Sequence, residues 1–149
     1  MTNPFQGVNH IGYVVSDLDL AERFVTEVLG FEVVAERTGE LGDAESDLMT
    51  RRLGVHPRAT GSFRFYRTGD QLIEFLQWQS PDQVTIPARN SDLGGRHLAL
   101  SVTDMPAAIE RISAFPGAIV REPNDRGYVY VTTPFGLEVQ LIPVEGGTR

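Results

Sequence analysis

The period of the apolar pattern changes at two places along the chain, and it changes in the same way each time. From Asn9 the segment NHIGYVVSDLDLA alternates and then takes helical spacing, and RHLALSVTDMPAA from Arg96 repeats this change. Alternation with period two predicts a strand, and apolar residues three or four apart predict a helix. A Ser-Asp or Thr-Asp pair lies between the two patterns, where an N-cap is expected. Each copy is therefore predicted to be a strand followed by a helix.

Both predicted helices have an apolar stripe and a stop signal. The stripe of the first consists of Ala21, Phe24, Val25 and Val28, with Gly30 placed to end the helix in a left-handed turn. The stripe of the second consists of Met105, Ala108, Ile109 and Ile112, before Pro116 and Gly117.

After each predicted helix the sequence contains a short strand and then a hairpin. The short strands are FEVVAE and AIVRE, and the hairpins are SFRFYRTGDQLIEFLQW and GYVYVTTPFGLEVQLIP. Each half of the chain thus has the order βαβββ. We predict an α+β fold with one domain over residues 1–149, made of two modules at about 5–79 and 94–144.

Alternation also predicts which side chains share a sheet face. The apolar residues expected to face the helices are Ile11, Tyr13, Val15, Ile73 and Phe75 in the first module and Leu98, Leu100, Val102, Val139 and Leu141 in the second. The opposite face then receives His10, Glu74, His97, Glu138 and Gln140. Polar side chains with nitrogen and oxygen donors are therefore expected together on one face.

An insertion between Glu36 and Gly61 interrupts the first module. It contains turn residues and room for one short helix. The segment is either a lid over a site or an ordinary surface loop. His56, beside Pro57, is interpreted as a solvated loop residue.

Composition excludes several classes of function. The formal charge is −7 and the chain has no basic run, which argues against nucleic acid and anionic lipid as partners. No apolar run approaches the roughly 20 residues of a membrane helix, and the first residues do not resemble a signal peptide. The absence of cysteine fits a reducing compartment, so we expect a cytoplasmic protein. We also expect a homodimer that acts on a small molecule.

The absence of cysteine also limits any metal site to nitrogen and oxygen ligands. Two imidazoles and at least one carboxylate on one face suit Zn, Ni, Co, Mn or Fe(II) and leave open positions for water or substrate. The alternative is that each histidine is an ordinary strand residue and Glu74 pairs with a cation. Because His10 and His97 occupy equivalent positions, 87 residues apart in the repeat, we favour the metal.

Five segments resemble the vicinal oxygen chelate superfamily in order and spacing. They are VNHIGYVVSDLD, RFVTEVLGFEVV, QLIEFLQW, GRHLALSVTD and TPFGLEVQLI. The family includes glyoxalase I, methylmalonyl-CoA epimerase, extradiol dioxygenases and the fosfomycin and bleomycin resistance proteins. The resemblance implies a curved mixed sheet that forms a cup, helices on its outer face, and one divalent metal ion. It maps the metal ligands to His10, Glu74, His97 and a fourth residue near the C-terminus.

The fourth ligand position departs from the family pattern. Members usually place a glutamate four residues after the glycine of the last turn, whereas Gly136 here leads to Gln140. The internal repeat also aligns Glu74 with Gln140. Glu138 is the alternative ligand, but using it would move the metal by one two-residue repeat, about 6.8 Å. We favour Gln140.

Hairpin pairing adds three candidate substrate-binding residues. The predicted register sets Arg64 opposite Glu74, where it either clamps a substrate carboxylate or forms an ion pair with Glu74. The same reasoning places Tyr128 and Tyr130 beside Gln140 and Glu138. The two tyrosines either contact a ligand or simply line the sheet.

A metal that holds two adjacent substrate oxygens stabilises an enolate or oxyanion between them. With Glu138 or Glu74 as general base, this chemistry predicts a metal-dependent isomerase, epimerase or lyase acting on a small oxygenated substrate. The alternatives are a non-haem Fe(II) extradiol-type dioxygenase, and a binding or drug-resistance protein without catalysis. Glutathione is disfavoured as co-substrate, because Val14 replaces the arginine that glyoxalase I enzymes place four residues after the first histidine.

Overall fold

The chain divides into two compact units, Met1–Gln83 and Val84–Arg149. The computed structural model describes residues 3–42 and 47–148. Each unit contains one four-stranded mixed sheet, and the order of the strands is the same in both. The α+β prediction with two βαβββ modules is confirmed.

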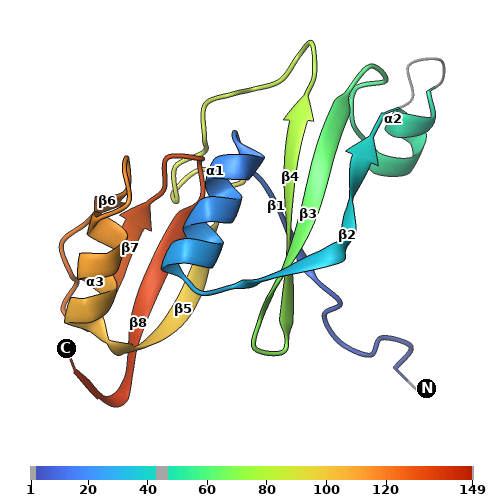
Figure 1. Cartoon of the computed structure of the whole chain (residues 1–149). Helices are drawn as coiled ribbons and strands as arrows, with labels where there is room; N and C mark the ends of the chain where they lie inside the picture. Colours follow the sequence, from blue (N-terminus) through green and yellow to red (C-terminus); the bar gives the residue numbers. More distant parts are fainter. Residues whose placement is uncertain (1–2, 43–46, 149) are drawn as a thin grey trace. The chain divides into compact units, whose positions relative to one another are not determined.

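The first unit has the sheet order β1-β4-β3-β2 (Figure 1). Its elements are β1 (Ile11–Val14), α1 (Leu18–Arg23), η1 (Phe24–Val28), β2 (Glu32–Leu41), α2 (Leu48–Leu53), β3 (Thr60–Thr68) and β4 (Gln71–Gln79). Strand β1 runs parallel to β4, whereas the β2–β3 and β3–β4 pairs are antiparallel.

The second unit repeats this topology in the order β5-β8-β7-β6. Its elements are β5 (His97–Asp104), α3 (Met105–Ser113), β6 (Ile119–Val120), β7 (Val129–Thr132) and β8 (Glu138–Thr148). Strand β5 is parallel to β8, and α3 contacts β5, β6 and β8 (Figure 1).

Both helices begin where the sequence predicts. The side chain of Asp17 accepts a hydrogen bond from the Leu20 amide at 2.8 Å, and Asp104 accepts one from the Ala107 amide at 3.0 Å. These bonds satisfy amide groups that have no partner in the first turn of a helix. The first helix continues through the π-helical turn η1, and Gly30 follows it at a φ of 75°.

Apolar side chains of the strands and helices fill the core of each unit. In the first unit the fully buried ones include Phe24, Val25, Tyr66, Ile73 and Phe75, and in the second Val129, Val131, Phe135, Val139 and Leu141. Helix α1 contacts β3 and β4. The predicted helix-facing positions at the last strand of each module are therefore confirmed, and the intervening polar residues lie on the other sheet face.

The strand register of the two sheets is equivalent. Gly12 on β1 pairs with Glu74 on β4, and Ala99 on β5 pairs with Gln140 on β8. Ala99 is the repeat counterpart of Gly12, at the same spacing that separates His97 from His10. The backbone pairing thus supports the alignment of Glu74 with Gln140, which the sequence repeat alone suggested.

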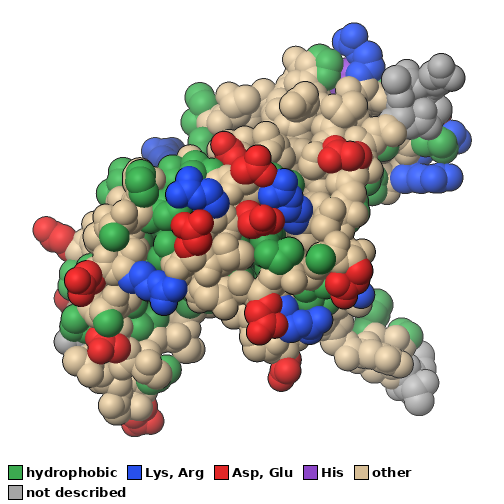
Figure 2. Space-filling view, viewed as in Figure 1, with side chains coloured by type: hydrophobic (Ala, Val, Ile, Leu, Met, Phe, Trp, Pro, Cys, Tyr) green, Lys and Arg blue, Asp and Glu red, His purple; other side chains and the backbone are tan. Residues whose placement is uncertain are grey.

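The insertion in the first module contains the predicted short helix, α2, and a β2 strand that extends to Leu41. Residues 43–46 of the insertion lie outside the described part of the chain. None of the helices in the described part combines the length and the apolar character that crossing a bilayer requires. On the face visible in Figure 2, basic and acidic side chains lie beside one another.

Candidate metal centre

In the first unit, His10 and Glu74 form a pair of metal-type donors. His10 precedes β1, and its Nε2 lies 3.4 Å from Oε2 of Glu74 on β4. The ring Nδ1 is 2.8 Å from Oδ1 of Asn9. An amide oxygen only accepts, so the contact is a hydrogen bond in the tautomer that has the ring proton on Nδ1, and in that tautomer Nε2 keeps a lone pair. A nitrogen and an oxygen bound to one tetrahedral ion at about 2.0–2.1 Å are about 3.3 Å apart, which is close to this separation.

Small and aromatic residues surround this pair. A Cβ atom on Gly12 would lie 3.2 Å from Oε2 of Glu74, so the glycine leaves space beside the carboxylate. Phe65 lies opposite Glu74 on β3, and its ring meets the His10 ring edge-on with centroids 5.0 Å apart. The guanidinium of Arg37 lies 5.5 Å from the centroid of the Phe65 ring. The sequence pattern did not identify Gly12, Phe65 or Arg37 as site residues.

In the second unit, His97 and Gln140 occupy the equivalent positions. Tyr130 lies opposite Gln140, and the amide Nε2 of Gln140 donates a hydrogen bond to the phenol oxygen at 2.9 Å. The His97 ring meets the Tyr130 ring edge-on at a centroid distance of 5.4 Å. The predicted placement of Tyr130 beside Gln140 is confirmed.

Phe65 and Tyr130 are therefore counterparts in the two units. Each lies opposite the last-strand donor of its module and packs edge-on against the histidine of its module. The two differ by one hydroxyl group, which is present where the donor is an amide and absent where it is a carboxylate. The internal repeat does not identify this pair, because the 66-residue offset between Glu74 and Gln140 aligns Tyr130 with Arg64; the hairpin registers identify it instead.

Glu138 is a second carboxylate beside the His97 position. The two residues are register partners on β5 and β8, and Thr132 lies opposite Glu138 on β7. Oxygen Oε2 of Glu138 is buried and has no hydrogen-bond partner within the described chain. Its other oxygen lies 3.8 Å from Nη2 of Arg121, which also donates to Thr132 at 2.7 Å. A buried acceptor without a donor is costly, so this oxygen is available to a group of the substrate.

The predicted position of Arg64 is wrong. The β3–β4 hairpin closes with Thr68 opposite Gln71, around the loop Gly69–Asp70, and this register pairs Arg64 with Phe75. The arginine therefore lies on the helix side of the sheet, and its guanidinium contacts Asp19 at 2.6 Å and Glu22 at 3.2 Å. Neither a substrate clamp beside Glu74 nor an ion pair with Glu74 is compatible with this position. The loop length decided the register, and the sequence pattern did not fix that length.

Glu22 connects Arg64 to a buried phenol on the same sheet face. The hydroxyl of Tyr66 donates to Oε2 of Glu22 at 3.0 Å, and the Tyr66 side chain is fully buried. Burial and the negative charge of Glu22 raise the pKa of Tyr66 well above its usual value of 10.0. This network connects α1 to β3.

The predicted place of Tyr128 on the sheet face of Gln140 and Glu138 stays a prediction. Thr132 lies opposite Glu138, and Tyr130 lies opposite Gln140. Tyr128 lies just before the first residue of β7, and Tyr130 and Thr132 are both closer to Glu138 along the chain. The backbone amide of Tyr128 donates to Oδ1 of Asn124 at 3.0 Å. Tyr128 therefore belongs to the turn before β7 and does not lie opposite either donor.

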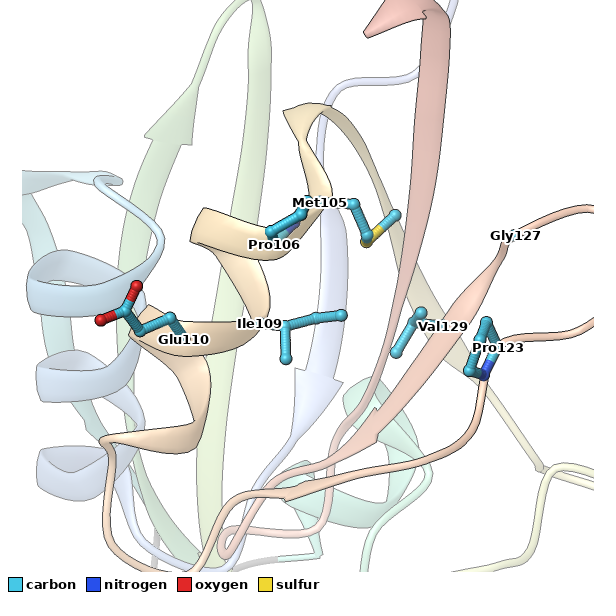
Figure 3. Close-up of a pocket in the computed structure, with 7 residues that line it drawn as sticks. All are labelled: Met105, Pro106, Ile109, Glu110, Pro123, Gly127 and Val129. Carbon is cyan, nitrogen blue, oxygen red and sulfur yellow. The ribbon is translucent and has the colours of Figure 1, made fainter. Parts of the chain in front are cut away.

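An apolar cavity of about 550 Å³ lies in the second unit between α3 and the segment that leads into β7. Its walls are Met105, Pro106, Ile109, Glu110, Pro123, Gly127 and Val129. Figure 3 shows Ile109 pointing from α3 toward Val129, while the carboxylate of Glu110 points away. Since Val129 and Tyr130 are adjacent in β7, they face opposite sides of the sheet. The cavity is thus on the helix side, away from Gln140.

The donor types suit a divalent ion, although the described residues form no cluster of three or more charged or imidazole donors. Among the described residues, no group of three or more His, Cys, Asp or Glu side chains lies close enough to hold an ion. The expectation therefore rests on the pair His10–Glu74 and on its repeat counterpart His97–Gln140. Two imidazoles, one carboxylate and one amide oxygen are ligands that first-row divalent metals accept.

Comparison with known proteins agrees with the fold. Residues 7–141 match the model of the Glyoxalase/Bleomycin resistance protein/Dioxygenase superfamily. A 2-epi-5-epi-valiolone epimerase from an Actinomyces species is 38% identical over 151 residues, which cover 94% of this chain and 80% of the epimerase.

Solved structures share the fold at low sequence identity. A glyoxalase family protein from Bacillus cereus matches with a TM-score of 0.73 and 20% identity over 95% of both chains. The fosfomycin resistance protein FosX from Listeria monocytogenes, complexed with Mn(II) and sulfate, matches with a TM-score of 0.61 and 17% identity, over 95% of this chain and 94% of FosX.

The chain belongs to the glyoxalase, bleomycin resistance protein and dioxygenase superfamily. It is an enzyme of this superfamily, and the predicted isomerase or epimerase class is confirmed. The superfamily includes members that bind a divalent metal, as FosX does with Mn(II).

Proposed function

We propose that the protein epimerises a hydroxylated ketone of the valiolone type at a stereocentre beside the carbonyl group. The observation that carries this proposal is the buried Oε2 of Glu138, which has no hydrogen-bond partner among the described residues and lies on the strand that also contains the donor Gln140. The 38% identity with a 2-epi-5-epi-valiolone epimerase supports the substrate class. The proposed reaction breaks one C–H bond and re-forms it on the opposite face, so it needs no oxidant or reductant.

We further propose a ligand set for one divalent ion per chain, chosen from Zn, Ni, Co, Mn and Fe(II). His10 and Glu74 supply one half of the set, and His97 and Gln140 supply the other. The 3.4 Å separation of the His10 and Glu74 donor atoms supports the first half. When bound, the ion would act as a Lewis acid toward negative charge that develops on substrate oxygens.

In this proposal Glu138 removes the proton from one face of the substrate carbon, solvent supplies a proton to the opposite face, and Glu138 then releases its own proton to solvent. Its Oε2 has no donor from the described chain, so the lone pairs remain available to a substrate C–H group. Arg121, 3.8 Å from Oε1, balances the charge of the carboxylate, and its hydrogen bond to Thr132 holds the guanidinium beside it. Glu74 is the other carboxylate predicted to serve as a base, and its contact with His10 favours a ligand role instead.

Hydrogen exchange tests the reaction directly. The purified protein, loaded with one equivalent of Mn(II), is incubated with 2-epi-5-epi-valiolone in D₂O and followed by proton NMR. We expect loss of the signal of the proton beside the carbonyl and the appearance of a second epimer. A substrate that keeps this proton and its configuration would contradict the proposal.

Two variants separate the base from the ligand. Glu138→Ala should retain the metal and lose exchange by a factor of about 100 or more, because the proton acceptor is missing. Gln140→Ala should weaken the metal instead. If metal binding is lost in Glu138→Ala and retained in Gln140→Ala, Glu138 is the fourth ligand, and the alignment through Gly136 is incorrect.

We also propose that the protein is a cytoplasmic homodimer. The absence of cysteine supports a reducing compartment. Three large apolar side chains are strongly exposed on one segment of the second unit, Val84, Ile86 and Leu93, which supports an association surface. Sedimentation of the full chain at micromolar concentration measures its mass, and a monomer would contradict the dimer.

A further inference from the structure

A cation lies on the sheet face of the second unit that carries Glu138. Arg121 directly follows β6, and its backbone amide donates to the carbonyl oxygen of Tyr130 on β7 at 2.9 Å. The register of β6 and β7 pairs Ile119 with Thr132, so Arg121 lies on the same face as Thr132 and Tyr130. The guanidinium donates from Nη2 to Oγ1 of Thr132 at 2.7 Å, which places it on this face.

Arg121 and Glu138 balance each other's charge without forming a hydrogen bond. Nη2 of Arg121 is 3.8 Å from Oε1 of Glu138, which is longer than the donor–acceptor distances of about 2.7–3.2 Å in N–H···O bonds. At this separation the opposite charges still compensate each other, so the pair has no net charge. A ligand group beside the pair therefore experiences little net attraction for either sign of charge, and the pair suits an uncharged polar group.

The guanidinium of Arg121 keeps donors that the described residues do not use. An arginine side chain has five N–H groups in a fixed planar arrangement. Among the described residues, this guanidinium contacts Thr132 and Glu138, and both contacts involve Nη2. The Arg121 side chain is 57% exposed, whereas that of Glu138 is 16% exposed. Nε and Nη1 are therefore open to an oxygen atom of a ligand, beside the carboxylate that is the proposed base.

Thr132 orders the guanidinium before any ligand binds. Strand β7 lies between β6 and β8, and Thr132 on β7 is opposite Glu138 on β8. Arg121 thus reaches over β7 toward the carboxylate, and its hydrogen bond to Thr132 holds it there. A side chain that is already ordered loses less conformational entropy when it binds a ligand, so this arrangement favours recognition of a ligand by Arg121.

We infer that Arg121 is a substrate-binding residue that determines specificity, because it donates to an uncharged oxygen, a hydroxyl or a carbonyl, of the substrate whose C–H group faces Glu138. This inference rests on the proposed function. It narrows the substrate class to ketones without a phosphate or carboxylate group, since Glu138 offsets the charge of the guanidinium. The sequence assigned the reading of a substrate carboxylate to Arg64, whereas Arg121 reads a neutral oxygen. The inference involves residues of the second unit alone.

Steady-state kinetics of the proton exchange described above test the inference. Arg121→Met should raise KM for 2-epi-5-epi-valiolone about tenfold or more, as expected for the loss of a hydrogen bond from a charged donor. Arg121→Lys keeps the positive charge beside Glu138 but lacks the planar arrangement of donors, so its KM should stay at least about threefold above that of wild type. If Arg121 only balanced the charge of Glu138, lysine would restore the KM of wild type.

Removal of single oxygens from the substrate identifies the contact. Among singly deoxygenated analogues of the ketone, the one that lacks the contacted oxygen should have the same KM with wild type and Arg121→Met, because the hydrogen bond is absent in both cases. Arg89→Met is the matched control, since the guanidinium of Arg89 is bonded to Asp92 at 3.0 and 2.9 Å. Its KM should equal that of wild type. Circular dichroism of each variant measures folding.

The outcomes separate the inference from the proposed function. An unchanged KM in folded Arg121→Met, or a KM fully restored by Arg121→Lys, would overturn the inference while exchange by wild type stands. The phosphate monoester of the ketone tests the preference for a neutral group, and its KM with wild type should be no lower than that of the free ketone. A KM about tenfold lower for the ester, lost in Arg121→Met, would show an anion site and overturn the inference. Absence of exchange in wild type would instead overturn the proposed function.

Discussion

Gly12 and Glu74 are register partners on the parallel strands β1 and β4, and the glycine leaves the carboxylate its space. A Cβ atom at position 12 would come within 3.2 Å of Oε2, which is tighter than most contacts of a real Cβ atom. The same carboxylate oxygen lies 3.4 Å from Nε2 of His10. A side chain at position 12 would therefore disturb the donor pair directly.

Gly12→Val should weaken divalent metal binding about tenfold while the protein remains folded. The branched side chain would displace the carboxylate, whereas valine suits a strand better than glycine does. Calorimetric titration with Mn(II) and thermal denaturation measure the two effects. Val14→Ile is the control, because Val14 lies on the same strand but pairs with Leu76. Unchanged affinity in Gly12→Val would mean that the position of the Glu74 carboxylate does not matter for the metal.

Changing His10 and His97 to alanine together should abolish metal binding and leave the fold intact. Neither histidine belongs to the buried core, so their loss creates no cavity in either core. Plasma mass spectrometry of protein purified without an affinity tag should give about one ion per chain for wild type and none for the double variant. Equal metal content in the two proteins would remove both histidines from the ligand set. His56→Ala is the control, since its Nδ1 accepts the backbone amide of Arg58 in the insertion.

Arg64→Leu should lower stability by about 1–2 kcal/mol and leave substrate binding unchanged. The change removes the guanidinium from Glu22, which is about two-thirds buried and would keep only its bond to Tyr66. Urea denaturation measures the loss. Arg23→Leu is the matched control, because it breaks an exposed ion pair with Glu27. This change should lower stability by less than about 0.5 kcal/mol. A rise in KM without loss of stability would restore Arg64 as a substrate-binding residue.

Alkaline conditions should weaken the folded state through Tyr66. Burial and the charge of Glu22 raise the pKa of Tyr66 in the folded protein above its usual 10.0. Above that pH the unfolded chain loses the phenol proton while the folded chain keeps it, so unfolding becomes more favourable as pH rises. Below a pH equal to the usual pKa of 10.0, both the folded and the unfolded chain keep the phenol proton, so the contribution of Tyr66 to folding stability is fully present. Urea denaturation at about pH 9 and about pH 11 should show a smaller fall in stability for Tyr66→Phe than for wild type. An equal fall in both proteins would exclude this origin.

The repeated modules and their helix positions were predictable from the sequence. Asp17 and Asp104 cap helices where the polar pattern changes period, and Ile73 and Phe75 are buried as alternation requires. These features depend on neighbours in the chain, so a linear pattern contains them. The candidate donors follow from the same alternation, which is why His10 and Glu74 share a face.

The hairpin registers were harder to predict from the sequence. Tyr130 was placed on the sheet face of Gln140 and Glu138, where the structure pairs it with Gln140, whereas Arg64 was placed on the wrong face because the first hairpin closes around Gly69–Asp70. A register shift of one residue moves every side chain of a strand to the other sheet face. The alternation of apolar and polar residues does not show which register the turn imposes.

The sequence by itself determined the two βαβββ modules, the caps of α1 and α3, and the residue types available as donors. Tertiary structure decided that Arg64 pairs with Asp19 and Glu22, that Gly12 makes room for Glu74, and that Tyr130 forms a hydrogen bond with Gln140. The spacing of apolar residues in a helix or strand follows from the backbone geometry of that segment, so a short stretch of sequence is enough to show it. Contacts between residues far apart in the chain depend on strand register and side-chain packing, which only the folded sheet specifies.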